Sequence, residues 1–271
     1  MAHGLTAMRA GDAALTVDAD DGARITSLRV GDHELLVPHD GIGPGWTYGS
    51  FVMAPWAGRI RDGIASWNGL TGQYPRQPDD GHGLHGLVHS AAWSQVSPTR
   101  WALDVPGLGD GGWLAPIHLE QLLALHPDRL ELSLEVTAPA PVPVTVGWHP
   151  WFHRRLGGAA VELDLPAGYL RERDATGIAT DRRVPVPPPP WDDAFGGRTG
   201  PITLTWPGVL RLELEHDGPV TVVFTGKDHA VCVEPQTGPP DEVNTRPRIV
   251  APDRPLRLTS TWRWTRLGTS P

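Results

Sequence analysis

Apolar and polar residues alternate one by one in many short segments of this sequence, and this pattern limits the possible folds more than any other feature. The alternation is clearest in RLELSLEV (residues 129–136), VLRLELEH (209–216) and PLRLTSTWRWT (255–265). A period of two places every apolar side chain on one face of an extended strand. The sequence therefore predicts an all-β protein whose strands bury one face.

Turn-forming residues separate these segments along the whole chain. The 32 glycines and 29 prolines are spread out, which is typical of many short strands joined by turns. Residues 118–126 (HLEQLLALH) are the best candidate for an amphipathic helix, but a strand is an equally good interpretation. Since no linker or repeat stands out in the 271 residues, we expect a single domain, residues 1–271, folded as a large sandwich or barrel.

Composition narrows the possible partners. The formal net charge is −8, the isoelectric point is about 5.8, and the basic residues are scattered, so neither nucleic acid nor an anionic membrane is an expected partner. A single cysteine, Cys232, allows no internal disulfide and no site built from several thiolates. The sequence has no apolar signal segment and no apolar stretch of membrane-spanning length, which favours a cytoplasmic protein.

The segment APWAGRIRDG carries two arginines that could contact a ligand. Arg59 and Arg61 alternate around one residue, so they point the same way on an extended backbone, and Asp62 and Gly63 then favour a turn. Both arginines could be ordinary surface residues. Alternatively, the fixed fork of donors on one guanidinium holds the oxygens of a ligand.

The segment GHGLHGLVHS contains three histidines at spacings of three and four. His82, His85 and His89 would align on a helix and suggest a metal site, but the glycines between them disfavour a helix. No carboxylate or cysteine accompanies them locally. A loop that presents one imidazole to a pocket is the better interpretation, and zinc remains the alternative.

The segment TVGWHPWFHR places a histidine between two tryptophans. Alternation puts Trp148 with the preceding valines on one face of a strand, and His149 on the other. The backbone after it is stiffened by Pro150. Such a histidine could belong to a packed aromatic cluster, or it could act as a proton donor in a pocket.

The segment AVCVEPQTGPPDEVN offers a carboxylate. Glu234 shares a strand face with Cys232 and is predicted to end that strand, because Pro235 and a loop rich in glycine and proline follow. A carboxylate above an apolar strand can act as a base with a raised pKa, whereas the plain alternative is a glutamate on the rim of a sheet. Cys232 is typical of a small buried hydrophobic residue, and no serine-nucleophile, phosphate-loop or dinucleotide motif is present.

Taken in order, GRIRDG with WNG, HGLHG, GWHPWF, WDDAF and EPQTGPPDEVN resemble the motifs of the aldose 1-epimerase (galactose mutarotase) family. The resemblance implies a large antiparallel β-sandwich, the galactose mutarotase-like supersandwich. It also implies an isomerase that interconverts the α and β anomers of a free aldose without a cofactor or metal. The partner would be a monosaccharide, and the protein a monomer or homodimer.

The same resemblance implies roles for individual residues. The substrate-binding residues would be Arg59, His85 and Asp192, with Asp193 as the alternative to Asp192. The catalytic residues would be His149 as general acid and Glu234 as general base. In the expected reaction, a Glu234 carboxylate takes the proton of the anomeric hydroxyl while a His149 imidazolium protonates the ring oxygen, so both groups would be charged at neutral pH.

Other functions fit the same features. Many members of the family carry asparagine before the pocket arginine, where this chain has Gly58, which leaves the identity of the aldose open. A hexose-6-phosphate epimerase would need extra basic residues, for which Arg61 and Arg76 are candidates. A non-catalytic sugar-binding or sensing protein, or a metal-dependent enzyme that uses the histidine loop, would also suit the fold.

Overall fold

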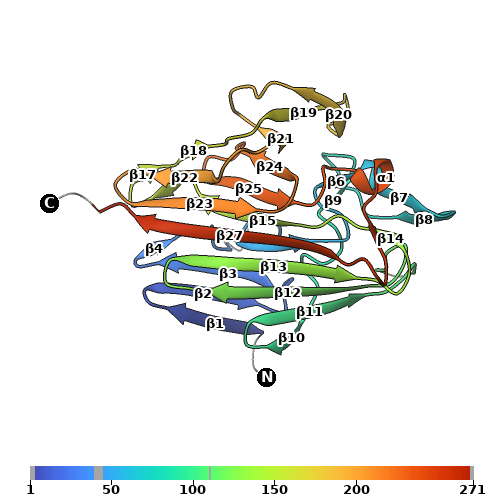
Figure 1. Cartoon of the computed structure of the whole chain (residues 1–271), viewed down its shortest axis with the longest axis horizontal. Helices are drawn as coiled ribbons and strands as arrows, with labels where there is room; N and C mark the ends of the chain where they lie inside the picture. Colours follow the sequence, from blue (N-terminus) through green and yellow to red (C-terminus); the bar gives the residue numbers. More distant parts are fainter. Residues whose placement is uncertain (1–3, 40–44, 110, 269–271) are drawn as a thin grey trace.

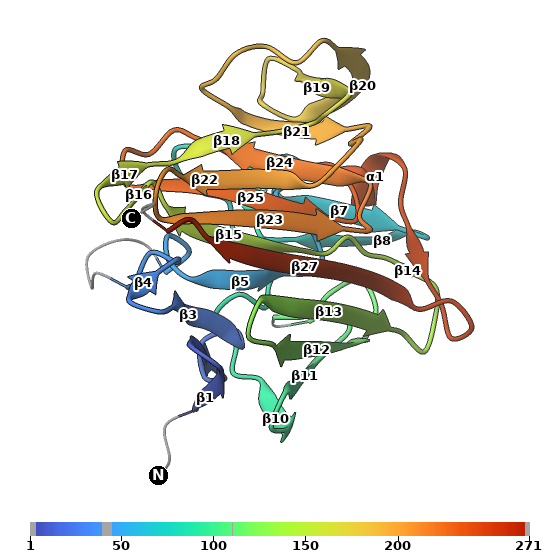
Figure 2. The same ribbon diagram turned by 60° about the vertical axis from the view of Figure 1, so that its left-hand side comes forward.

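The structure of the protein, a computed structural model, describes residues 4–39, 45–109 and 111–268. These residues form two large antiparallel sheets, seen in Figures 1 and 2. The eleven-stranded sheet has the order β1 (Leu5–Ala10), β2 (Ala13–Asp18), β3 (Arg24–Val30), β5 (Ser50–Met53), β15 (Gly147–His153), β25 (Ala230–Gln236), β24 (Val220–Phe224), β21 (Asp192–Gly196), β19 (Tyr169–Arg173) and β20 (Ala179–Val184), with β4 (His33–Glu34) beside β3.

The second sheet has eight strands. Its order is β10 (Ser94–Ser97), β11 (Arg100–Val105), β12 (Ile117–Leu125), β13 (Arg129–Thr137), β27 (Leu256–Arg266), β23 (Leu210–His216), β22 (Ile202–Trp206) and β18 (Glu162–Asp164). The two-stranded pairs are β6 (Arg59–Ile60) with β9 (Gly83–Leu84), β7 (Ile64–Trp67) with β8 (Leu70–Gln73), β14 (Val142–Pro143) with β26 (Ile249–Val250), and β16 (Arg155–Leu156) with β17 (Ala159–Ala160).

Helix is confined to short pieces in the described part of the chain. These are a 3₁₀ turn η1 (Arg61–Gly63) and one α-helical turn α1 (Glu242–Thr245). Neither is long and apolar enough to cross a membrane. The predicted all-β sandwich is confirmed, and residues 118–126 lie almost entirely in strand β12 rather than in a helix.

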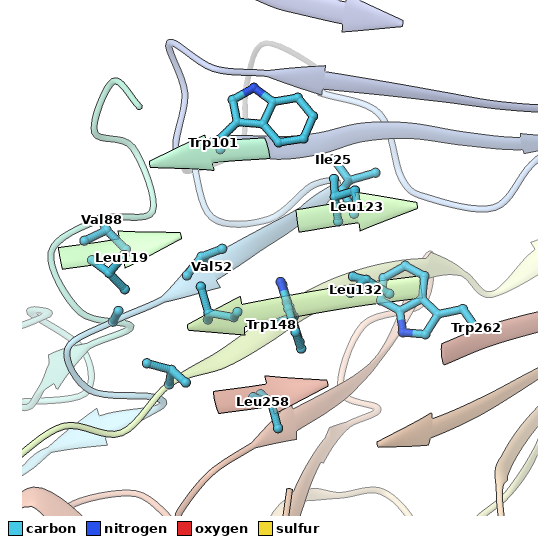
Figure 3. Close-up of a cluster of buried hydrophobic side chains, with 14 of the residues drawn as sticks. Ile25, Val52, Val88, Trp101, Leu119, Leu123, Leu132, Trp148, Leu258 and Trp262 are labelled. Carbon is cyan, nitrogen blue, oxygen red and sulfur yellow. The ribbon is translucent and has the colours of Figure 1, made fainter. Parts of the chain in front are cut away.

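The main core lies between the two sheets, where their apolar faces meet. Ile25, Val52 and Trp148 from the first sheet belong to the same buried cluster as Leu132 and Trp262 from the second, as Figure 3 shows. The alternation predicted for β13, β23 and β27 is confirmed, because the apolar set of each strand is buried in this cluster. The opposite face of the central strands is left to form the candidate site.

One strand boundary differs from the prediction. Strand β25 does not end at Glu234 but continues through Pro235 to Gln236. Its register with β15 is constant, with Gly147 opposite Gln236 and Trp151 opposite Cys232, but the hydrogen-bonded ladder is interrupted between these pairs. Prolines in both strands fall within this interruption, where their missing N–H groups cost no ladder hydrogen bond.

Candidate active site

Three neighbouring strands in the middle of the first sheet bring the two candidate catalytic residues together. Strand β15 runs between β5 and β25. His149 lies directly opposite Phe51 on one side, and the register on the other side puts it level with Glu234. Nε2 of His149 is 3.3 Å from Oε1 of Glu234. Sheet pairing alone therefore joins residues 85 positions apart in the sequence.

Three aromatic rings contact the ring of His149. Phe51 is stacked on it with ring centroids 4.9 Å apart, and Trp151 is stacked on it at 5.2 Å with an interplanar angle of 9°. His85 is nearly perpendicular to it, at 4.9 Å and 88°. These three contacts fix the orientation of the ring. Trp148 faces the core, on the opposite side of the strand, and donates a hydrogen bond to Gln121 at 2.8 Å.

Burial governs the protonation of the pair. His149 is 4% exposed and Glu234 is 2% exposed. Desolvation lowers the pKa of His149 to about 3. Desolvation, helped by the negative charge of Asp192, raises the pKa of Glu234 well above its usual value, although Gln236 donates a hydrogen bond to its Oε2 at 3.0 Å. Desolvation thus disfavours the charged forms of both groups, which are the forms that the reaction expected from the sequence requires for ring opening.

The loop that carries His85 is shaped by its glycines. His85 itself has φ of +61°, and its N–H donates to the carbonyl of Gly58 at 2.8 Å. Gly86, at φ +80°, has so little space that a Cβ would lie 1.9 Å from the carbonyl oxygen of Ala54. Nδ1 of His85 lies 3.2 Å from Sδ of Met53. Burial lowers the pKa of His85 well below its usual value, with the nearby His149 adding to the effect, so the ring is neutral at pH 7.

The short pairing of β6 with β9 places Arg59 beside this loop. The Arg59 guanidinium donates to Asp80 at 2.8 Å and to Asp192 at 3.1 Å. Burial works against its charge, but Asp192 and Asp80 outweigh burial and raise the pKa of Arg59. Asp193 points to a different partner, Arg173, at 2.9 Å. Of the two candidate aspartates, Asp192 is the one that lines the pocket with Arg59.

All five site residues predicted from the sequence line one pocket of about 280 Å³. It is bounded by the predicted set and by further side chains, namely Trp46, Leu84, Trp151, Val222, Phe224, Lys227 and Pro240. The pocket therefore combines an apolar wall with an acid–base pair, an arginine and a carboxylate. Such a mixture is typical of a site for a small polar ligand with an apolar face.

The other candidates lie outside this pocket. Nδ1 of His82 accepts a hydrogen bond from the backbone of Asp62, and His89 packs against Phe51. His85 and His89 both contact Phe51, whereas His82 lies beside Asp62 and the carbonyl of Thr176. Within residues 4–39, 45–109 and 111–268, no group of three or more His, Cys, Asp or Glu is placed to hold a metal ion. Cys232 is fully buried, as the sequence predicted, and burial raises the pKa of its thiol.

Arg61 does not point into the pocket with Arg59 as the alternation predicted. The chain leaves the extended conformation at η1, so the two side chains diverge. The Arg61 guanidinium donates to Asp174 at 2.6 Å and to the hydroxyl of Thr176 at 2.9 Å.

Several contributors to the site were not predicted. Gln236 could have been found, because it lies two residues after Glu234 on the same strand face. Lys227 could have been noticed because it is the single lysine of the sequence. Phe51 and Asp80 come from segments distant in the sequence, and nothing local marks them as partners of His149 and Arg59.

Solved structures show the same fold. A putative aldose 1-epimerase from Escherichia coli superposes with a TM-score of 0.79 at 19% sequence identity, covering 98% of this chain and 100% of that one. A galactose mutarotase-like protein from Clostridium acetobutylicum gives 0.83 at 14%, covering 96% and 94%. A galactose 1-epimerase from Lactobacillus acidophilus gives 0.78 at 15%, covering 97% and 93%. A comparison with curated protein sequences gave no match.

The sequence also matches the family model for aldose 1-epimerases over residues 8–203. This is well over half of the 271 residues, although it ends before Glu234. The resemblance found in the motifs and the shared fold agree with this match. The chain belongs to the aldose 1-epimerase family.

Proposed function

We propose that this protein is a mutarotase that interconverts the α and β anomers of a free aldose, with His149 and Glu234 as its acid–base pair. The observation that carries the proposal is that these two side chains are both buried and both line the pocket, with Nε2 of His149 3.3 Å from Oε1 of Glu234. A protein that only bound a sugar would gain nothing from a matched acid and base that burial makes costly to charge.

The pocket supplies the contacts that a monosaccharide needs. Its volume of about 280 Å³ suits one small ligand. Arg59 can donate to sugar hydroxyls while its orientation is held by Asp80 and Asp192. Phe224 offers an apolar ring to the C–H face of the sugar. We assign sugar binding to Arg59, Asp192 and His85.

The reaction requires two proton transfers. Glu234, as a carboxylate, removes the proton of the anomeric hydroxyl, and His149, as an imidazolium, protonates the ring oxygen as its bond to the anomeric carbon breaks. The aldehyde then rotates about its bond to the next carbon. Closure on the other face returns both protons, one from the Glu234 carboxylic acid to the former carbonyl oxygen and one from the sugar hydroxyl to His149.

Burial of the pair stabilises the intermediate of this reaction. After ring opening, Glu234 holds a proton and His149 has lost one, so both side chains are neutral. These are the forms that desolvation favours for each group. The pocket therefore lowers the free energy of the intermediate state, in which the open-chain aldehyde is bound and both side chains are neutral. Ring opening begins from the charged forms of both groups, so contacts with the bound sugar must offset the free energy needed to charge them.

Polarimetry of freshly dissolved α-glucose and α-galactose tests the proposal. The wild-type protein should accelerate the decay of optical rotation, and Glu234→Gln and His149→Gln should each lose about 10²-fold or more in rate, because each removes a positioned proton-transfer group. Glu162→Gln is the matched control, because it is also a glutamate-to-glutamine change but lies at an exposed position of strand β18. This variant should keep the wild-type rate.

Circular dichroism would verify that the variants are folded. Acceleration by wild type and both site variants alike would remove the pair from the mechanism. Equal sugar binding by wild type and Glu234→Gln, with no acceleration by either, would support a binding protein instead.

A further inference from the structure

The chain contains 22 arginines but one lysine, Lys227. This lysine lies in the connection between β24 and β25 and lines the candidate active site with Phe224 and Glu234. Lys227 is exposed, whereas the acid–base pair is buried in the inner part of the same pocket. An ammonium group therefore stands at the mouth of the site.

The turn that carries Lys227 is held in place by Arg154. The Arg154 guanidinium donates to the carbonyl of Lys227 at 2.9 Å, to that of Thr225 at 2.7 Å and to that of Ala230 at 3.3 Å. The backbone N–H of Arg154 donates to the carbonyl of His229 at 2.9 Å. The ring of His229 is also parallel to that of Trp151, with an angle of 7°. The backbone of the turn is thus held in place, and it positions the amine of Lys227 at the pocket wall.

Arg59, which lines the pocket, and the neighbouring Arg173 are already matched by carboxylates. Arg59 is paired with Asp80 and Asp192. Arg173 lies 2.9 Å from Asp193, and Asp192 is also within 3.6 Å of it. Among the residues that the structure describes, no ion pair involves Lys227, so its charge is free to meet a ligand. A neutral sugar has no group that needs such a charge.

We propose that Lys227 is a specificity-determining residue that binds an anionic substituent of the aldose, at the end away from the anomeric carbon. The inference rests on the proposed mutarotation. The shared chemistry is a carboxylate or phosphate on a hexose. The anomeric carbon must reach the buried pair, so the remote end of the sugar faces the exposed ammonium. Lysine suits this task as a compact point charge on a flexible stem, which needs no fixed bidentate geometry.

Matched substrate pairs test the inference. The measured quantity is the ratio of kcat/KM for an anionic sugar to that for its neutral counterpart, using galacturonate with galactose and glucose 6-phosphate with glucose. Lys227→Gln should lower this ratio about fivefold for at least one pair, mainly through KM, because an exposed charge pair contributes modestly. Lys227→Arg should restore most of it. Arg9→Gln, which removes the same charge from the exposed edge strand β1, should leave the ratio unchanged.

The outcomes separate the two proposals. A fall in only the galacturonate ratio identifies a carboxylate as the ligand, and a fall in only the glucose 6-phosphate ratio identifies a phosphate. Unchanged ratios in Lys227→Gln, with neutral sugars still converted, would overturn the role of Lys227 and leave the mutarotase proposal intact. Failure of the wild-type protein to convert any of the four sugars would overturn both. The fall should also shrink as ionic strength rises, since exposed charges are screened.

Discussion

At the scale of single residues, the sequence motifs identified His149 and Glu234 but not their protonation. The reaction expected from the sequence has both groups charged at neutral pH. In the structure, Phe51 and His85 come from distant segments and close the space around the histidine, so desolvation dominates both pKa values. Motif order can therefore locate candidate groups, but the environment that sets their chemistry comes from tertiary packing.

His216 gives a separate test of what burial does to a histidine. It lies on β23 outside the candidate active site, 8% exposed, and its Nε2 is 2.9 Å from the hydroxyl of Thr221. Burial, with help from Arg198, lowers its pKa to about 3. Below pH 6.5 the unfolded chain gains a proton at this residue and the folded chain does not, until the pH approaches 3. The free energy of unfolding must therefore fall as the pH decreases through this window.

The expected loss through His216 between pH 7.5 and pH 5 is about 2 kcal/mol. Urea unfolding of wild type and His216→Gln at both pH values measures it. The variant is expected to be less stable at pH 7.5 but to lose about 2 kcal/mol less on acidification. Equal losses in the two proteins would show that His216 is not held in its neutral form.

At the scale of elements, alternation predicted the long strands and the strand faces that carry His149 and Glu234, but not the shortest strands of the site. Strands β12, β13, β23 and β27 have seven or more residues, enough for the period of two to be read. The pair β6 and β9 has two residues in each strand, too few for any pattern, yet it aligns Arg59 with the histidine loop. The function of such elements depends on long-range pairing, which local sequence does not specify.

The hairpin of β19 and β20 projects beyond the body of the two sheets in both views (Figures 1 and 2). Its turn depends on Asp174, which accepts hydrogen bonds from the backbone of Thr176 at 2.8 Å and of Ile178 at 3.2 Å. The same carboxylate accepts a bond from Arg61, far away in the sequence. Thr176 and Arg61 between them hold the pKa of Asp174 well below its usual value. The carboxylate of Asp174 thus joins the turn internally and ties it to Arg61.

We expect Asp174→Ala to loosen this turn. Amide hydrogen exchange at Thr176 and Ile178 should accelerate about tenfold or more, because the variant loses acceptors both within the turn and toward Arg61. Glu172→Ala is the matched control, since it removes from the same hairpin a carboxylate bonded only to the exposed Arg182. If exchange in the Asp174 variant equals that of the control, the turn is held by other contacts.

At the scale of the whole molecule, we propose that residues 1–271 form one domain. The main buried cluster contains residues from Ala13 to Trp264 and from both sheets. Strand β27, near the C-terminus, lies between β13 and β23 in the middle of the second sheet. Separation of the chain into two folding units would therefore expose the largest apolar surface of the protein.

A single cooperative unfolding transition is the expected consequence. Far-ultraviolet circular dichroism and tryptophan fluorescence should give coincident urea curves, because the twelve tryptophans and the strands would be lost together. Two separated transitions would contradict the single domain. The sandwich class could be predicted from alternation, but the central pairing of β5, β15 and β25 could not, since these strands come from three distant parts of the sequence.

The balance of basic residues has a further consequence if the protein is the proposed mutarotase. Free aldehydes condense with neutral amines to form imines, whereas arginine remains a protonated guanidinium. Among its side chains this protein offers a single amine to such aldehydes, and it stands at the mouth of the pocket. Slow glycation of side-chain amines by concentrated sugar would therefore be concentrated at Lys227, at the entrance of the pocket.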